Sequence, residues 1–130
     1  MESLIFDTTF LIDFQRERQR TRGIAHSFLE AHADAAAYLP ITAYGEYAEG
    51  FPNRTDPAFL SIVESFELLP VTREVANTYA KITRNLRSKG QLIGANDLWI
   101  AATAIEKNHP LVTRNIADFS RVPGLELRSY

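Results

Sequence analysis

Residues 96–105 read NDLWIAATAI, a run of small and apolar side chains with one carboxylate near its start. The run predicts a helix in which Ile100, Ala101 and Ala104 follow Asp97 by three, four and seven residues. These positions share one helix face, so the carboxylate of Asp97 is carried toward the interior. A buried carboxylate is costly unless it is protonated, hydrogen-bonded, paired with a cation or bound to a metal ion. No lysine or arginine stands three or four residues away to pair with it.

Three more acids stand beside apolar segments, at places where strands end or helices pack: Asp7, Glu46 and Asp118. Together with Asp97 they predict one cluster of carboxylates. Two carboxylates about 4 Å apart repel by about 4 kcal/mol at an effective dielectric of 20, so such a cluster requires protons or cations. Mg²⁺ or Mn²⁺ is the expected cofactor because both ions prefer hard oxygen ligands.

The composition is that of one globular domain spanning residues 1–130, with 45% hydrophobic and 23% charged residues. The start, MESLIFD, has no basic segment, and no later run approaches the ~20 apolar residues of a membrane span. We therefore expect a cytoplasmic protein without a membrane partner. The chain has no cysteine, which excludes disulfides, cysteine-bound zinc and thiol catalysis.

The formal net charge of −2 does not favour nucleic-acid binding, but basic residues are concentrated in two stretches. A local cluster of basic residues matters more than the net charge of the chain for contact with phosphate groups. Both stretches are equally compatible with an ordinary solvated surface. The first contains Arg16, Arg18, Arg20 and Arg22, and the second contains Lys81, Arg84, Arg87 and Lys89.

Strand and helix signals alternate along the chain, which predicts an α/β fold with a central parallel sheet and helices on both faces. The strand candidates are residues 3–6, 36–39, 66–71, 110–113 and 125–128. In such sheets, ligands bind at the carboxyl ends of the strands. Asp7 follows the first strand, and Thr113, Arg114 and Asn115 end or follow a late one. The two loops are therefore expected to share one rim.

The order of these acids resembles the PIN-domain family of metal-dependent ribonucleases, and specifically its small branch, the VapC-type toxins of bacterial toxin/antitoxin pairs. The resemblance extends from Leu4 to Leu127, and one departure is the helix-interior Gly45 directly before Glu46. The matching pieces are Asp7-Thr8-Thr9 with Leu11-Ile12, Glu46 with Gly50, residues 94–102, residues 111–115, Asp118-Phe119 and the closing Pro123-Gly124-Leu125.

This resemblance implies a single PIN-like domain that acts as an endoribonuclease and hydrolyses RNA phosphodiesters with metal-activated water. It also implies a homodimer and a cognate antitoxin that covers the acidic site. The carboxylates by themselves indicate a phosphodiester substrate, and the choice of RNA comes from the resemblance.

Each candidate residue has a functional and a purely structural interpretation. Asp7 and Asp97 are expected to bind the metal ion, Glu46 to bind it or to orient a water, and Asp118 to complete the cluster or hold a second ion. Alternatively, Asp7 caps a helix, Asp97 is stabilised by a helix dipole and Asp118 caps a turn.

Other polar residues are expected around these acids. Thr9, Thr113 and Asn115 suit hydrogen bonds that orient the acids, although they are also common turn residues. Arg114 joins the arginines of residues 16–22 as a candidate RNA contact. Asp13 and Glu17 are expected on a solvated helix face.

Two other functions are compatible with parts of the sequence. A phosphatase or phosphoacceptor domain would use Asp7 as a nucleophile, but residue 9 is threonine where haloacid-dehalogenase-like phosphatases carry a second aspartate. A catalytically silent binding module could retain the fold, although the complete set of acids argues against it.

Overall fold

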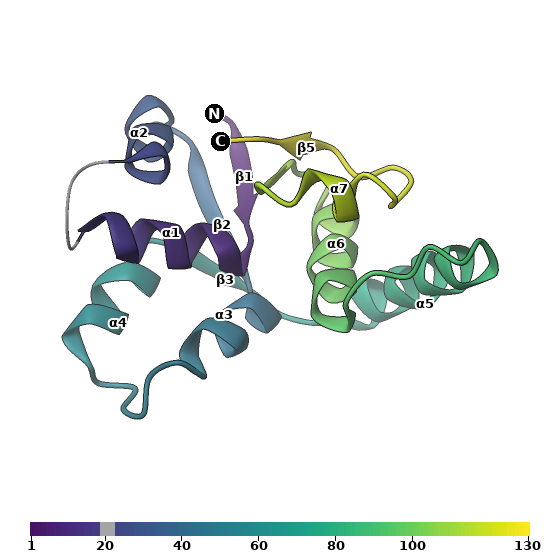
Figure 1. Ribbon diagram of the computed structural model, residues 1–130, viewed down its shortest axis with the longest axis horizontal. Helices are drawn as coiled ribbons and strands as arrows, with labels where there is room; N and C mark the ends of the chain where they lie inside the picture. The colour runs from purple at the N-terminus through teal and green to yellow at the C-terminus, as the bar shows by residue number, and fades with distance from the viewer. Residues whose placement is uncertain (19–22) are drawn as a thin grey trace.

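The computed structural model describes residues 1–18 and 23–130 and consists of one sheet with helices on both sides (Figure 1). The elements follow the alternation predicted from the sequence. They are β1 (Ser3–Phe6), α1 (Thr8–Arg18), α2 (Ile24–Ala31), β2 (Ala36–Pro40), α3 (Ile41–Ala48), α4 (Pro57–Val63), β3 (Glu67–Leu69), α5 (Arg73–Ser88), α6 (Ala95–Lys107), β4 (Leu111–Val112), α7 (Ile116–Phe119) and β5 (Leu127–Arg128).

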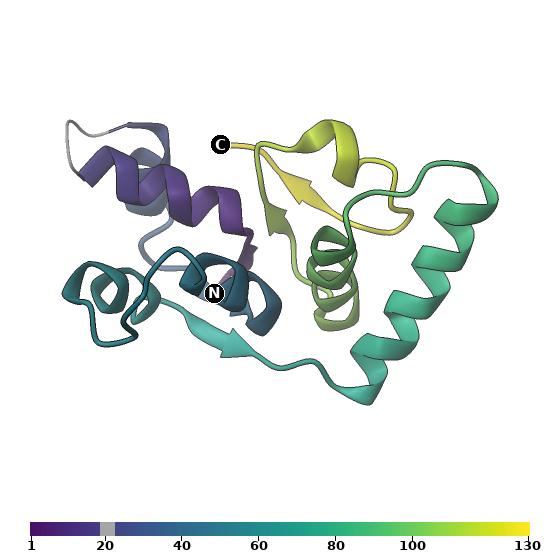
Figure 2. The same cartoon turned by 60° about the horizontal axis from the view of Figure 1, so that its bottom comes forward.

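The five strands are parallel and lie in the order β3-β2-β1-β4-β5, so β1 is central. Helices α1 to α4 lie on one side of the strands and α5 to α7 on the other (Figures 1 and 2). This change of side follows from the strand order. The connections from β1 to β2 and β3 run toward one edge of the sheet, and those from β3 to β4 and β5 run toward the other edge. Right-handed crossovers in opposite directions place their helices on opposite faces. The predicted parallel α/β sheet is confirmed.

The core forms between the sheet and the two helix layers. Leu4, Ile5 and Phe6 of β1 are completely or almost completely buried, as expected for a central strand covered on both faces. Helix α6 buries the continuous stretch from Ile100 to Ala104, and the small side chains there let the helix approach its neighbours closely. Trp99 on the same helix stacks on Tyr79 of α5, with ring centroids 3.8 Å apart.

Two local sequence signals set the ends of α5, the longest described helix. The hydroxyl of Thr72 accepts a hydrogen bond from the backbone N–H of Val75 at 3.1 Å, which caps the first turn. Gly90 follows the helix with φ of +65°, a conformation that glycine adopts at little cost.

Strands β3, β4 and β5 are shorter than predicted, and one helix was not predicted. Strand β3 ends at Leu69 instead of continuing to residue 71, because Pro70 cannot donate to a ladder of hydrogen bonds. Strand β4 is limited to Leu111 and Val112. Helix α7 was not predicted, since a helix of four residues is too short to show periodicity. Within the described residues, no helix is long and apolar enough to cross a membrane.

Candidate active site

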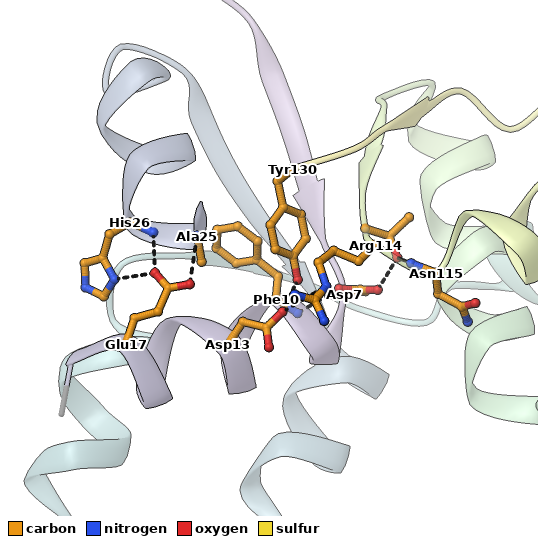
Figure 3. Close-up of polar contacts among 10 residues, drawn as sticks. Asp7, Phe10, Asp13, Glu17, Ala25, His26, Arg114, Asn115 and Tyr130 are labelled. Atoms are coloured by element: carbon orange, nitrogen blue, oxygen red, sulfur yellow. Dashed lines mark hydrogen bonds and ion pairs between the residues drawn. The ribbon is translucent and has the colours of Figure 1, made fainter. Parts of the chain in front are cut away.

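Asp7 and Thr113 are adjacent because they follow neighbouring strands at equivalent positions. Phe6 of β1 pairs with Val112 of β4, so the next residue of each chain segment leaves the sheet at the same edge. The hydroxyl of Thr113 donates to Oδ2 of Asp7 at 2.5 Å, and the backbone N–H of Phe10 donates to Oδ1 at 2.9 Å. Asp7 is only 3% exposed, so a carboxylate is held rigidly at the carboxyl end of the central strand (Figure 3).

Asp7 titrates well above an ordinary aspartate. Burial is the main cause and raises its pKa to about 6, with the charges of Asp97 and Asp13 acting in the same direction. The hydrogen bonds from Thr113 and Phe10 favour the ionised form and oppose this rise. The carboxylate therefore lies in a low-dielectric, negative environment, which is the kind of site that a cation neutralises.

Asp97 lies in the first turn of α6 and is half-buried. Burial raises its pKa, and repulsion from Glu46 and Asp118 raises it further. Its carboxylate makes no hydrogen bond or ion pair with any residue in 1–18 or 23–130. Asp97 interacts electrostatically with each of the other three predicted acids, so the fold brings all four into one negative region.

Glu46 is exposed on α3 and is connected to α6 by Asn96. The side-chain amide of Asn96 donates to Oε1 of Glu46 at 2.8 Å and to the carbonyl of Thr42 at 3.4 Å. Since Asn96 immediately precedes Asp97, this contact fixes Glu46 relative to the turn that carries the second acid. Sequence reasoning included Asn96 only as part of the helix motif and did not assign it this role.

Asp118 is half-buried on α7 and is held by the same loop that holds Asp7. Asn115 donates to Oδ2 of Asp118 from its side chain at 3.2 Å and to the hydroxyl of Thr113 from its backbone N–H at 2.9 Å. Thr113 and Asn115 thus link two of the acids by hydrogen bonds. Thr9 is exposed in the first turn of α1, and its side chain makes no hydrogen bond with a described residue, so it orients neither acid in this structure.

The predicted RNA contacts are only partly described. Arg16 is exposed on α1, and Arg114 follows Thr113 with its side chain half exposed. Arg20, Arg22 and the side chain of Arg18 lie outside the described residues. The role of these arginines stays a prediction.

The expectation that Asp13 lies on a solvated helix face is wrong. Its side chain is only 14% exposed; Oδ2 accepts a 2.7 Å hydrogen bond from the hydroxyl of Tyr130 and lies 3.5 Å from Nε of Arg114 (Figure 3). Asp13 also raises the pKa of Asp7 by charge repulsion, so it is a fifth acid in the same region. Its position three residues after the buried Phe10 is the sequence signal that could have placed it beside the core.

Glu17 is also more enclosed than expected. Its carboxylate accepts hydrogen bonds from the backbone N–H groups of Gly23, Ala25 and His26, and lies 3.0 Å from Nδ1 of His26 (Figure 3). Because these are N–H groups at the start of α2, Glu17 caps that helix from α1. No motif spans this contact, and sequence reasoning missed it.

The donor set fits a divalent cation. The acids around Asp97 carry repelling charges, and none of the main causes of the pKa shifts of Asp7 and Asp97 is a basic side chain. Within the described part of the chain, no three acidic or histidine side chains are grouped closely enough to form a metal site by themselves. Mg²⁺ requires less than that, since it commonly binds one or two carboxylates and keeps several waters.

Comparison with protein families gives a match to the PIN domain over residues 4–125. The chain therefore belongs to the PIN-domain family. Ribonuclease VapC of Rickettsia bellii is 36% identical over 132 residues, covering 95% of this chain and 93% of that protein. Ribonuclease VapC1 of Methanocaldococcus jannaschii is 34% identical over 128 residues, covering 98% and 86%. Within the family, the chain thus groups with the VapC ribonucleases.

Solved structures confirm the fold. A complex of VapBC2 from Rickettsia felis bound to a DNA fragment from its promoter matches with a TM-score of 0.85 and 24% identity, over 98% of each chain. VapBC-5 from Mycobacterium tuberculosis, a member of the VapBC family of toxin-antitoxin systems, matches with a TM-score of 0.67 and 24% identity, over 99% of this chain and 98% of that one. The match to the PIN domain favours a nuclease over the alternative of a phosphatase with Asp7 as nucleophile.

Proposed function

We propose that this protein is a divalent-metal-dependent endoribonuclease and the toxin component of a type II toxin/antitoxin pair. Family membership and relatives that are named ribonucleases support the activity. The observation that carries the proposal is the environment of Asp97, a half-buried carboxylate that is repelled by neighbouring acids and has no partner among the described residues. Such a group stays ionised at low cost only when a cation is bound.

Asp7 and Asp97 would hold Mg²⁺ or Mn²⁺, with Glu46 orienting a water of the ion and Asp118 completing the negative region. When bound, the ion supplies a water with a lowered pKa and neutralises charge on the attacked phosphate. The protein's own groups orient the acids: Thr113 fixes Asp7, and Asn96 fixes Glu46. These hydrogen bonds reduce the freedom of the carboxylates and preorganise the site for the ion.

The partners follow from the family. The structural neighbours include chains from VapBC complexes, one of them described as a toxin-antitoxin system, which supports a cognate antitoxin. Its placement over the acidic site is proposed from the resemblance. A homodimer is proposed from the same resemblance. The cytoplasm is the proposed location because the RNA substrate and the antitoxin are made there.

The test replaces single acids by their amides. D7N and D97N, each in a separate variant, should lose Mg²⁺-dependent cleavage of single-stranded RNA by at least about a hundredfold, because each removes a charged ligand. D34N is the matched control, since Asp34 is exposed in the turn before β2. Full cleavage by both D7N and D97N would reject the assignment.

A second pair of variants tests Glu46 with a control in the adjacent turn. E46Q should reduce cleavage, whereas E49Q should not, because Glu49 is an exposed residue at the end of the same helix.

Calorimetric titration with Mn²⁺ distinguishes a metal-binding active site from a catalytically silent binding module. Specific binding that disappears in D97N supports the proposed site, and its absence in the unsubstituted protein contradicts it.

A further inference from the structure

The negative site lies next to Arg114, a cationic side chain whose geometry defines more than a general RNA contact. Arg114 follows Thr113, the residue that fixes Asp7, and its side chain is 50% exposed. A polyanionic RNA strand must approach a region containing Asp7, Asp13, Asp97 and their neighbours, which repels it. A cation at the edge of this region would attract the strand and offset that repulsion.

The guanidinium of Arg114 is held from two directions. Its Nε lies 3.5 Å from Oδ2 of Asp13, and its central carbon lies 6.0 Å from the ring centroid of Tyr130 (Figure 3). Both contacts leave the two terminal amino groups without a hydrogen bond to a described residue. A planar fork with two free donors is the arrangement that binds phosphate in a bidentate manner.

The residues that hold Arg114 are themselves fixed. Tyr130 donates its hydroxyl to Asp13 at 2.7 Å, and burial together with this hydrogen bond raises the pKa of Tyr130, so the hydroxyl remains a donor. The ring of Tyr130 packs edge-on against Phe10, with centroids 4.8 Å apart. The support under Arg114 therefore extends into the core of the domain.

Among the described residues, Arg114 forms an ion pair with Asp13 and with none of the candidate metal ligands. Its ion pair with Asp13 is long, and half of the side chain faces solvent. The positive charge thus remains available to a ligand that arrives from outside.

We propose that Arg114 binds a phosphate of the RNA strand beside the catalytic acids, and that Asp13 and Tyr130 are positioning residues that aim its guanidinium. This inference rests on the proposed ribonuclease function, because the phosphate belongs to the same strand that is cleaved. It adds to that function a defined phosphate subsite at the edge of the acidic region.

The first experiment measures binding without cleavage. A fluorescent single-stranded RNA oligonucleotide is titrated by anisotropy in EDTA at several NaCl concentrations. R114Q should weaken binding by about tenfold at low salt and should reduce the slope of log affinity against log salt by about 0.7, the value for one phosphate contact to a single strand. R73Q removes the same charge from the exposed start of α5 and should leave the slope unchanged.

The conservative variant separates charge from geometry. R114K keeps the charge but has neither a fork nor a planar group to lie over Tyr130, so affinity should fall several-fold while the salt slope stays near that of the unsubstituted protein. If R114Q retains the slope and affinity of R73Q, Arg114 is only a structural ion pair and the subsite is rejected. Thermal unfolding of R114Q in the same buffer verifies that the variant is folded.

A double-mutant cycle is needed to test the positioning role of Asp13, because D13N also removes a negative charge that repels RNA. In the R114Q background, D13N should strengthen RNA binding. In the unsubstituted background, D13N also releases the guanidinium of Arg114 from its position, which weakens binding and opposes this gain. The change in RNA affinity caused by D13N should therefore differ between the two backgrounds by about threefold or more. Y130F, which keeps the ring and removes the hydroxyl, should weaken binding only when Arg114 is present. Equal effects of D13N in both backgrounds would overturn the positioning role.

Cleavage kinetics distinguish a failure of this inference from a failure of the proposed function. If the unsubstituted protein cleaves RNA with Mg²⁺ and R114Q raises KM more than it lowers kcat, both stand. If the unsubstituted protein cleaves and R114Q has unchanged KM and affinity, only the inference fails. If the unsubstituted protein shows no metal-dependent cleavage, the proposed function fails, and with it the basis of the inference.

Discussion

Thr113 and Asp7 are 106 residues apart in the chain, and the hydroxyl of Thr113 donates a 2.5 Å hydrogen bond to Oδ2 of Asp7. Both side chains are buried, at 0% and 3% exposure. The contact joins the carboxyl ends of β4 and β1, so the strand pairing and the orientation of a candidate metal ligand depend on each other. We expect a hydroxyl at this position to serve both stability and the proposed function.

Replacement of Thr113 by valine should distinguish the contribution of its hydrogen bonds from that of its packing. T113V keeps the shape but leaves Oδ2 of Asp7 without its donor and the N–H of Asn115 without its acceptor. We expect the free energy of unfolding to fall by about 1–3 kcal/mol, measured by urea denaturation at pH 8. T113S, which keeps the hydroxyl, should lose much less. Equal losses for T113V and T113S would show that only packing matters.

The stability of the metal-free protein should depend on pH through Asp7. Because burial raises its pKa from 3.8 to about 6, the folded protein binds this proton more tightly than the unfolded chain does. The stabilisation is complete below about pH 4 and is lost as the pH rises through about 6. In EDTA, the unsubstituted protein should therefore lose on the order of 3 kcal/mol relative to D7N between about pH 4 and pH 7. Parallel pH profiles for the two proteins would contradict the raised pKa.

Asn96 should matter for activity although it is not an acid. N96A removes the 2.8 Å hydrogen bond that orients Glu46, and we expect a ten- to hundredfold loss of metal affinity or cleavage, typical of residues that orient metal ligands. The measurement is the Mg²⁺ concentration that gives half-maximal cleavage. N77A on the exposed side of α5 is the control, and an identical response of both variants would remove Asn96 from the site.

Glu17 should control the acid side of the stability profile. Burial raises its pKa, but the hydrogen bonds from His26, Ala25 and Gly23 more than offset burial and lower it below the ordinary value of 4.5. The stabilisation is thus present above about pH 4.5 and is lost as the pH falls through the lowered pKa. E17Q should cost about 1–2 kcal/mol at pH 7, by analogy with the loss of a helix cap, and should make acid unfolding less steep. E64Q, at an exposed position after α4, should change neither property.

The order of the elements and the four acids could be predicted because each has a local signal. Apolar runs mark β1 and β2, and Thr72 and Gly90 mark the ends of α5. The parallel sheet then brings the ends of β1 and β4 together without further information. The grouping of Asp97 with acids from three other segments follows the prediction, while its role as a metal ligand remains a proposal.

The remaining parts could not be predicted because their signals are spread over distant segments. The contact of Asp13 with Tyr130 spans 117 residues, and neither residue belongs to a local pattern that indicates it. Glu17 was expected on a solvated helix face, yet the start of α2 lies against its carboxylate. In both cases, the partner is supplied by the tertiary fold and not by the adjacent sequence.

Asp7 directly precedes α1, and the other three acids belong to α3, α6 and α7. The hydroxyl that donates to Asp7 comes from Thr113, near the other end of the chain. A ribosome-bound chain that has emerged only as far as α5 therefore contains Asp7 and Glu46 but neither Asp97 nor Thr113. The proposed cutting activity cannot arise until nearly all of the polypeptide has been made and folded. The cell that synthesises this chain would thereby be spared the proposed activity during translation.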